Sequence, residues 1–106
     1  MTIEKISKAD IVDRIYQNTD AGLIKADIKL VVESTFDAIK DALIDGDIVE
    51  LRGFGTFEIR VRKARPKARN PRTGEIVKCK AHGVAVFRAG SELKDAVWSI
   101  KHDRHH

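Results

Sequence analysis

The stretch RVRKARPKARNPRTGEIVKCK, residues 60–80, decides the shape of the fold. Nine of its residues are Lys or Arg and only Glu75 is acidic, so the segment repels itself. Its two halves nevertheless alternate like β-strands on either side of NPRTG (70–74), where Asn-Pro and Thr-Gly are turn signals. Because an isolated two-stranded ribbon is marginal in water, we expect a projecting hairpin arm that is mobile until a negatively charged partner lies against it.

The charge outside this arm has the opposite sign. The 106 residues carry a net charge of +4, but residues 60–80 alone carry +8 and the remaining residues −4. A polyanion is the natural partner of such a segment, and nucleic acid is favoured over a membrane because no amphipathic apolar helix accompanies the charges. The competing interpretation is a solvated run of charge without a partner.

Helical patterns lie before and after the arm. Ser7 is a good N-cap, with Asp10 completing a variant capping box, for a helix that runs to about residue 18. Apolar residues at 24, 28, 31, 32, 36, 39 and 43 keep helical spacing and predict a second helix over residues 24–44. Gly46 is the expected left-handed cap of that helix, and SELKDAVWSIK (91–101) predicts a short third helix.

Strand patterns fill the remainder of the chain. We expect a first strand at 48–52, a turn at 53–55 and a second strand through residue 62. A return strand is expected at 76–80, continued at 84–87 after a break at Gly83. The predicted class is α+β: two N-terminal helices, a three-stranded antiparallel sheet with a long basic β-hairpin arm (about 60–80), and a short C-terminal helix. Only about 80 residues then remain to form a core, a size at which oligomerisation is common.

The arm carries the candidate binding residues. Pro71 is rigid, lacks an N–H and presents an apolar ring, so it is a candidate wedge between base pairs, with Arg69 and Asn70 at minor-groove acceptors and Arg72 beside them. The competing interpretation is that these residues only build a turn. The cations along the strands are candidate phosphate contacts, which are blind to sequence: Arg60, Arg62, Lys63, Arg65, Lys67, Lys78 and Lys80.

Three segments together resemble the HU/IHF family of bacterial histone-like DNA-bending proteins: GFGTFEIR (53–60), RNPRTGE (69–75) and FRAGSELKDAV (87–97). The similarity covers residues 6 to about 101, and GFGTF followed by RNPxTG at this separation is its most specific part. It implies an intertwined dimer whose helices form a base and whose two arms embrace DNA, with Pro71 intercalating at a kink.

The resemblance also implies further roles for single residues. Lys8 and Arg88 would contact phosphates on the flank of the body. The second helix would contribute to the dimer core, and aromatic residues would fill the core instead of stacking on bases. These core positions are Phe36, Ile39, Leu43, Phe54 and Phe57.

The sequence also departs from the family pattern. Ala68 stands where a glycine usually precedes RNP, and RPKA (65–68) is one residue longer than usual, which is expected to shift the strand register near the tip. The prolines usual in the return strand are absent from KCKAHG (78–83) and VAVF (84–87). Residues 1–101 are expected to form one domain and 102–106 a flexible tail, which is either solvated or a cloning remnant; metal binding by its histidines is the alternative.

The leading interpretation is an architectural protein that bends and compacts double-stranded DNA largely without sequence specificity, as a homodimer or a heterodimer. A site-selective IHF-like bender, a binder of structured RNA and a module that adds its arm to another protein's sheet remain open. No nucleophile–base pair, phosphate loop or metal-ligand spacing is recognisable, so we expect no enzyme, cofactor, metal or small-molecule substrate. Cys79 has no disulfide partner and is expected to be an apolar filler.

The expected location is the cytoplasm, at the nucleoid. No apolar run approaches the length of a membrane span, and the first ten residues contain no apolar signal region. No membrane partner is expected.

Overall fold

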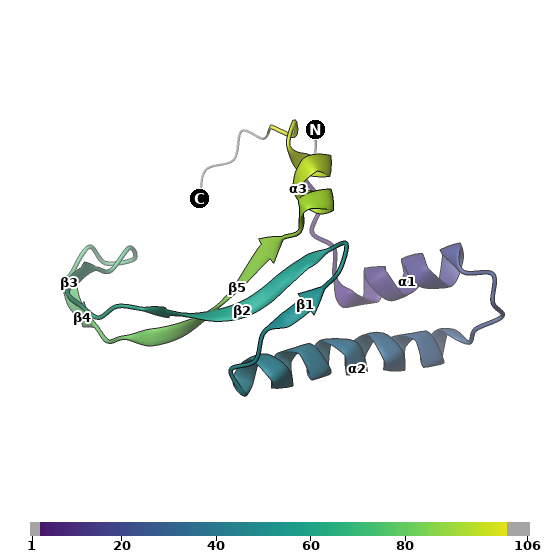
Figure 1. Ribbon diagram of the computed structural model, residues 1–106, viewed down its shortest axis with the longest axis horizontal. Helices are drawn as coiled ribbons and strands as arrows, with labels where there is room; N and C mark the ends of the chain where they lie inside the picture. The colour runs from purple at the N-terminus through teal and green to yellow at the C-terminus, as the bar shows by residue number, and fades with distance from the viewer. Residues whose placement is uncertain (1–2, 102–106) are drawn as a thin grey trace. The chain divides into compact units, whose positions relative to one another are not determined.

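The computed structural model describes residues 3–101. Two compact units are distinguished among these residues, the first comprising 3–41 and 99–101 and the second 42–98. In chain order the described elements are α1 (Lys8–Asn18), α2 (Lys25–Ile44), β1 (Val49–Leu51), β2 (Gly55–Arg62), β3 (Arg65–Arg69), β4 (Ile76–Cys79), β5 (His82–Ala89) and α3 (Ser91–Val97) (Figure 1). The predicted α+β class, with two helices before the sheet and a short one after it, is confirmed.

The start of α1 is fixed by the predicted capping box. The amide of Asp10 donates to Ser7 Oγ at 3.3 Å, and the amide of Ser7 donates to Asp10 Oδ2 at 2.9 Å. These bonds satisfy amides at a helix terminus that have no partner within the helix. The hydrogen bond that the Ser7 amide donates has the larger effect in holding the pKa of the Asp10 carboxyl below its ordinary value, and the bond that the Ser7 hydroxyl donates to Asp10 Oδ2 adds to it.

Helices α1 and α2 share a small apolar core. Val12, Ile28 and Val32 are buried, and Ile15 packs against them. The ammonium of Lys25 lies 2.5 Å from Asp13 Oδ1, and this bond and charge raise the pKa of Lys25. Of the rest of the long apolar stripe, Ile24, Val31 and Phe36 are exposed and residues 39 and 43 are half-buried, as expected for a surface that α1 cannot cover alone.

The end of α2 confirms the prediction for Gly46. Gly46 has a φ of 84°, and its amide donates to the carbonyl of Leu43 at 2.9 Å. The amide of Asp47 donates to the carbonyl of Ala42, also at 2.9 Å. This pair of bonds is a Schellman motif, which satisfies the last carbonyls of the helix.

The strands form two sheets in place of a single continuous one. Strands β1, β2 and β5 make a three-stranded antiparallel sheet, and β3 pairs with β4 in a separate two-stranded sheet. The predicted break at Gly83 was wrong, because Gly83 pairs with Val61 inside the β2–β5 ladder. The break falls instead at residues 80–81, between β4 and β5, with residues 63–64 interrupting the other strand.

The glycines of the sheet explain this difference. A Cβ on Gly83 would lie 3.1 Å from Ile59 Cγ2, so glycine permits a close approach there and does not mark the end of a strand. Gly53 has a φ of 83° in the turn after β1, whereas Gly55, expected in the same turn, already belongs to β2 and is buried.

Three phenylalanines form the apolar centre of the second unit. The ring of Phe87 lies 4.8 Å from that of Phe57 and 5.1 Å from that of Phe54, measured between centroids. Phe54 and Phe87 are nevertheless 47% and 42% exposed in the single chain. This aromatic cluster is therefore only partly covered by its own chain.

Candidate nucleic-acid interface

Strand β2 of the β2–β5 ladder places its charged side chains on one face and its apolar side chains on the other. Residues two apart on a strand share a face, and directly paired residues of neighbouring strands also share one. Thr56, Glu58, Arg60 and Arg62 therefore lie on one face, together with Arg88, which pairs with Thr56. We call this side the charged face. The aromatic cluster residues Phe57 and Phe87 lie on the opposite, apolar side.

Glu58 is at the centre of the charged face. Its Oε1 accepts a hydrogen bond from Arg60 Nη2 at 3.2 Å and lies 3.5 Å from Arg88 Nε. The Glu58 side chain is 17% exposed, compared with 53% for Arg60 and 63% for Arg88. The structure thus brings together two of the predicted phosphate-binding residues and an acid that the sequence interpretation passed over. The signal for it was Glu-x-Arg on one face of a strand.

Strand β3 contains the extra residue that the sequence indicated. Arg65 pairs with Cys79 and Ala68 with Val77, so the chain advances three residues on β3 but two on β4. The extra residue is accommodated as a β-bulge, which bends the strand and increases its twist. The expected shift of register near the tip is confirmed.

The tip is a closely bonded turn. The amide of Asn70 donates to the carbonyl of Glu75, and the amide of Gly74 donates to the carbonyl of Asn70, each at 2.7 Å. Asn70 Oδ1 accepts the amide of Arg72 at 2.9 Å, and Gly74 has a φ of 75°. Asn70 therefore builds the turn, as the simpler interpretation required, while its side-chain NH₂ group remains a hydrogen-bond donor.

The same turn presents the proposed wedge. Pro71 is exposed at the first position after Asn70, and Arg69 Nη1 lies 3.4 Å from the carbonyl oxygen of Gly74, across the hairpin. All the predicted cations of the arm are exposed, namely Arg60, Arg62, Lys63, Arg65, Lys67, Arg69, Arg72, Lys78 and Lys80. Turn formation and presentation of Pro71 are thus compatible roles.

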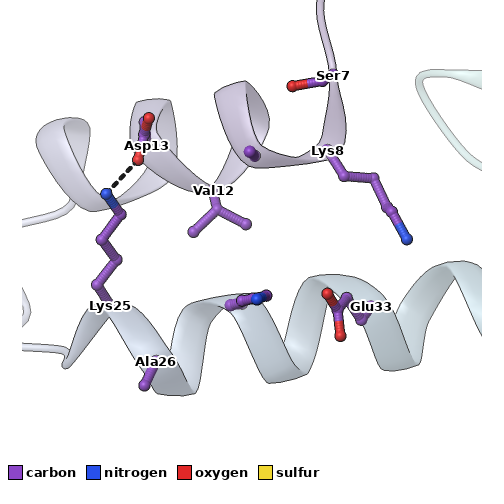
Figure 2. Close-up of a pocket in the computed structure, with 9 residues that line it drawn as sticks. Ser7, Lys8, Val12, Asp13, Lys25, Ala26 and Glu33 are labelled. Atoms are coloured by element: carbon purple, nitrogen blue, oxygen red, sulfur yellow. Dashed lines mark ion pairs between the residues drawn. The ribbon is translucent and has the colours of Figure 1, made fainter.

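Lys8 belongs to the first unit, at the first position of α1. It lines a groove of about 690 Å³ between α1 and α2, together with Val12 of α1 and with Lys25 and Glu33 of α2 (Figure 2). The side chain of Lys8 extends into the space between the helices, as Figure 2 shows. Lys8 is exposed and therefore accessible to an anion.

Two kinds of site are absent from residues 3–101, a metal-ligand cluster and a membrane-spanning helix. In this part of the chain no three His, Cys, Asp or Glu side chains are grouped so as to hold a metal ion. No helix in the same range has the length and apolarity to cross a membrane. Cys79 is half-buried, with its Sγ 3.9 Å from His82 Nδ1. The histidines considered for metal binding at 102, 105 and 106 fall outside the described residues.

Comparisons with known proteins agree with this geometry. The family described as Bacterial DNA-binding protein matches residues 6–98. Integration host factor subunit alpha of Hahella chejuensis is 45% identical over 92 residues, which cover 87% of this chain and 89% of that protein. DNA-binding protein HU of Streptococcus mutans is 45% identical over 91 residues, which cover 86% and 97%.

Solved structures show the same similarity. An Anabaena HU–DNA cocrystal structure gives a TM-score of 0.76 at 35% identity, covering 90% of this chain and 100% of that one. An HU mutant from Thermotoga maritima gives a TM-score of 0.61 at 28% identity, covering 87% and 99%.

Proposed function

The chain belongs to the HU/IHF family of bacterial DNA-binding proteins, and from this premise we propose that it bends and compacts duplex DNA largely without sequence specificity. Members of this family are architectural proteins of the nucleoid, so the proposed role is structural and not catalytic. The domain that carries it is residues 1–101, with the arm at about 60–80.

The observation that carries the proposal is the arm itself. Strands β3 and β4 form a narrow ribbon whose cations are all exposed and whose tip turn holds Pro71 at its end. A narrow ribbon with an apolar wedge at its tip suits a minor groove that opens at a kinked step. The exposed cations suit the phosphates on either side, and such contacts do not distinguish sequences.

The proposed phosphate contacts extend from the arm to the bodies of both units. On the second unit they include Arg88 of the charged face, and on the first unit Lys8 at the start of α1. Bending a site of 20–30 bp costs on the order of 1–6 kcal/mol. Contacts outside the arm offset that cost only when the DNA is bent towards them, so they favour the bent form.

A homodimer is the proposed assembly. The single chain leaves Phe54 and Phe87 half-exposed, together with Leu30 at 63% and Val31 at 62% on α2. Apolar surface of this extent on so small a chain is typical of a subunit interface. Equilibrium sedimentation of the purified chain tests the stoichiometry, because a heterodimer would require a second gene product.

Site-selective bending is the second candidate. It is favoured by the similarity to integration host factor subunit alpha, whereas the similarity to HU favours binding without a preferred site. Competition between a random-sequence duplex and duplexes rich in flexible TA and CA steps separates the two. A preference of less than about ten-fold supports the non-specific role, and a single preferred site above about 1,000-fold supports the selective one.

Fluorescence transfer between the ends of a doubly labelled duplex tests bending directly. Wild type is compared with Pro71→Ala at two salt concentrations, and Pro66→Ala, on the same arm but away from the tip, is the matched control. We expect wild type and the control to raise transfer and Pro71→Ala to bind with reduced bending. Steep salt dependence without bending by any of the three would reduce the arm to a polycationic clamp.

A further inference from the structure

We propose that Glu58 is an internal counter-ion that competes with DNA phosphate for Arg60 and Arg88, and that it thereby lowers the affinity and the salt dependence of DNA binding. The inference rests on the proposed function, because it concerns residues assigned there to phosphate. It assigns a role to an acidic residue in the middle of a basic surface.

The geometry gives both arginines the same acceptor. Arg60 Nη2 and Arg88 Nε lie 3.2 Å and 3.5 Å from a single oxygen, Oε1 of Glu58. Arg60 is two residues along the same strand, whereas Arg88 comes from β5, diagonally across the ladder from Glu58, which pairs with Val86. One carboxylate thus joins two guanidinium groups of neighbouring strands on the charged face.

Burial distinguishes Glu58 from its partners. Its side chain is 17% exposed, so solvent screens the carboxylate less than it screens a surface acid. The arginines are more than half exposed, and each guanidinium has five N–H donors, of which the contact with Glu58 engages few. A phosphate can therefore reach both arginines, but it must share them with a carboxylate of its own charge, and like charges brought together oppose binding.

The charge of the cluster fixes the expected size of the effect. Two guanidinium groups and one carboxylate present a net charge of +1, whereas the same cluster with Gln in place of Glu presents +2. One additional positive charge at the interface steepens the slope of log K against log salt by about 0.9. At an ionic strength of about 0.1 M, affinity is expected to rise roughly three- to ten-fold, and the gain shrinks as salt is added.

The chain provides a matched control. Glu50 on β1 pairs with Thr56, so it lies on the charged face, but it is exposed and makes no ion pair within residues 3–101. Glu50→Gln changes the net charge of the protein by the same amount as Glu58→Gln. Any general effect of net charge appears in both variants, whereas release of the two arginines appears only in Glu58→Gln.

The test measures binding of an arbitrary-sequence duplex by fluorescence anisotropy over a series of salt concentrations. We expect Glu58→Gln to bind more tightly and with a steeper slope than Glu50→Gln. We also expect the gain to fall by at least half when Arg88→Gln is present, since the double-mutant cycle measures the coupling. Glu58→Asp keeps the negative charge, so it should retain the wild-type slope of log K against log salt. It is the second variant to measure if urea unfolding shows that Glu58→Gln is unstable.

The outcomes separate this inference from the proposed function. If wild type does not bind duplex DNA with a measurable salt slope, the proposed function fails. If wild type binds but Glu58→Gln matches Glu50→Gln, or binds more weakly, Glu58 is not a competitor and only this inference is overturned. A gain that is unchanged in the Arg88→Gln and Arg60→Gln backgrounds would also overturn it.

Discussion

Replacement of Gly55 by alanine should be the most damaging single-methyl change in the sheet. Gly55 is buried at the start of β2, where it pairs with Ala89. A Cβ built on it would lie 2.5 Å from the carbonyl oxygen of Arg88 and 2.5 Å and 2.6 Å from two ring atoms of Phe87. Ordinary contacts between carbon atoms are about 3.5–4.0 Å, so both neighbours must move by about an ångström.

Neither movement is free of cost. The carbonyl of Arg88 is part of the β5 backbone, so its displacement opens the β2–β5 ladder. The Phe87 ring packs 4.8 Å from Phe57 and 5.1 Å from Phe54, so its displacement disrupts the aromatic cluster. Overpacking of a core costs about 1–3 kcal/mol, and the involvement of backbone places Gly55→Ala near the upper end, at about 3 kcal/mol.

Two other glycines calibrate this prediction. Gly53→Ala places a side chain at a φ of 83° and should cost about 1–2 kcal/mol. Gly83→Ala meets only the Ile59 side chain, at 3.1 Å, and should cost less than about 1 kcal/mol. Urea unfolding followed by circular dichroism at one fixed subunit concentration measures all three, because the stability of a dimer depends on concentration. A Gly55→Ala midpoint equal to or above that of Gly83→Ala would refute the packing argument.

Two further predictions concern the N-terminal cap of α1 and the turn at the tip of the arm. Ser7→Ala should cost about 1 kcal/mol by removing the cap of α1. The folded state lowers the pKa of Asp10, so this carboxylate stabilises the protein above its unfolded pKa of about 3.9, and that stabilisation is lost as the pH falls through the folded value. Urea midpoints across this acid range should therefore fall less steeply with decreasing pH in Ser7→Ala than in wild type. Equal steepness in the two proteins would contradict the role of Ser7 in lowering the pKa of Asp10. Asn70→Ala removes the acceptor for the Arg72 amide and should reduce bending more than affinity in the transfer assay, with Thr73→Val as a milder comparison at the same tip.

Signals in the sequence predicted those features whose hydrogen bonds join residues close together in the chain. The capping box at Ser7 and the left-handed cap at Gly46 each depend on hydrogen bonds within a few residues, so composition and spacing reveal them. The bulge in β3 was instead indicated by comparison with the family pattern, because one residue more than that pattern must be accommodated within the strand. The family resemblance added the intertwined dimer and the phosphate contacts of Lys8 and Arg88, whereas the arm itself was predicted from the charge and turn signals of residues 60–80.

The surroundings of Gly83 and Glu58 could not be predicted in the same way, because they depend on residues of a neighbouring strand. A glycine within a strand pattern signals either a break or a close approach of another group, and the choice depends on Ile59 of the neighbouring strand. The contact between Glu58 and Arg88 likewise depends on the register of β2 against β5. Since register joins residues that are distant in the sequence, neither outcome can be deduced from local spacing alone.

The cations of the second unit fall into two groups, those on the separate β3–β4 sheet and those around Glu58 on β2 and β5. On β3 and β4 the cations are exposed, and the described ion pairs of this unit lie instead around Glu58 on β2 and β5. The cations of β3 and β4 therefore meet phosphate without an ion-paired carboxylate, whereas Arg60, at the base of the arm, and Arg88 must first be shared with one. Electrostatic attraction that acts before contact is strongest where it is uncompensated. We therefore expect DNA to meet the arm first, with the charged face engaging only as the bent duplex reaches it, so that Glu58→Gln should slow dissociation more than it accelerates association.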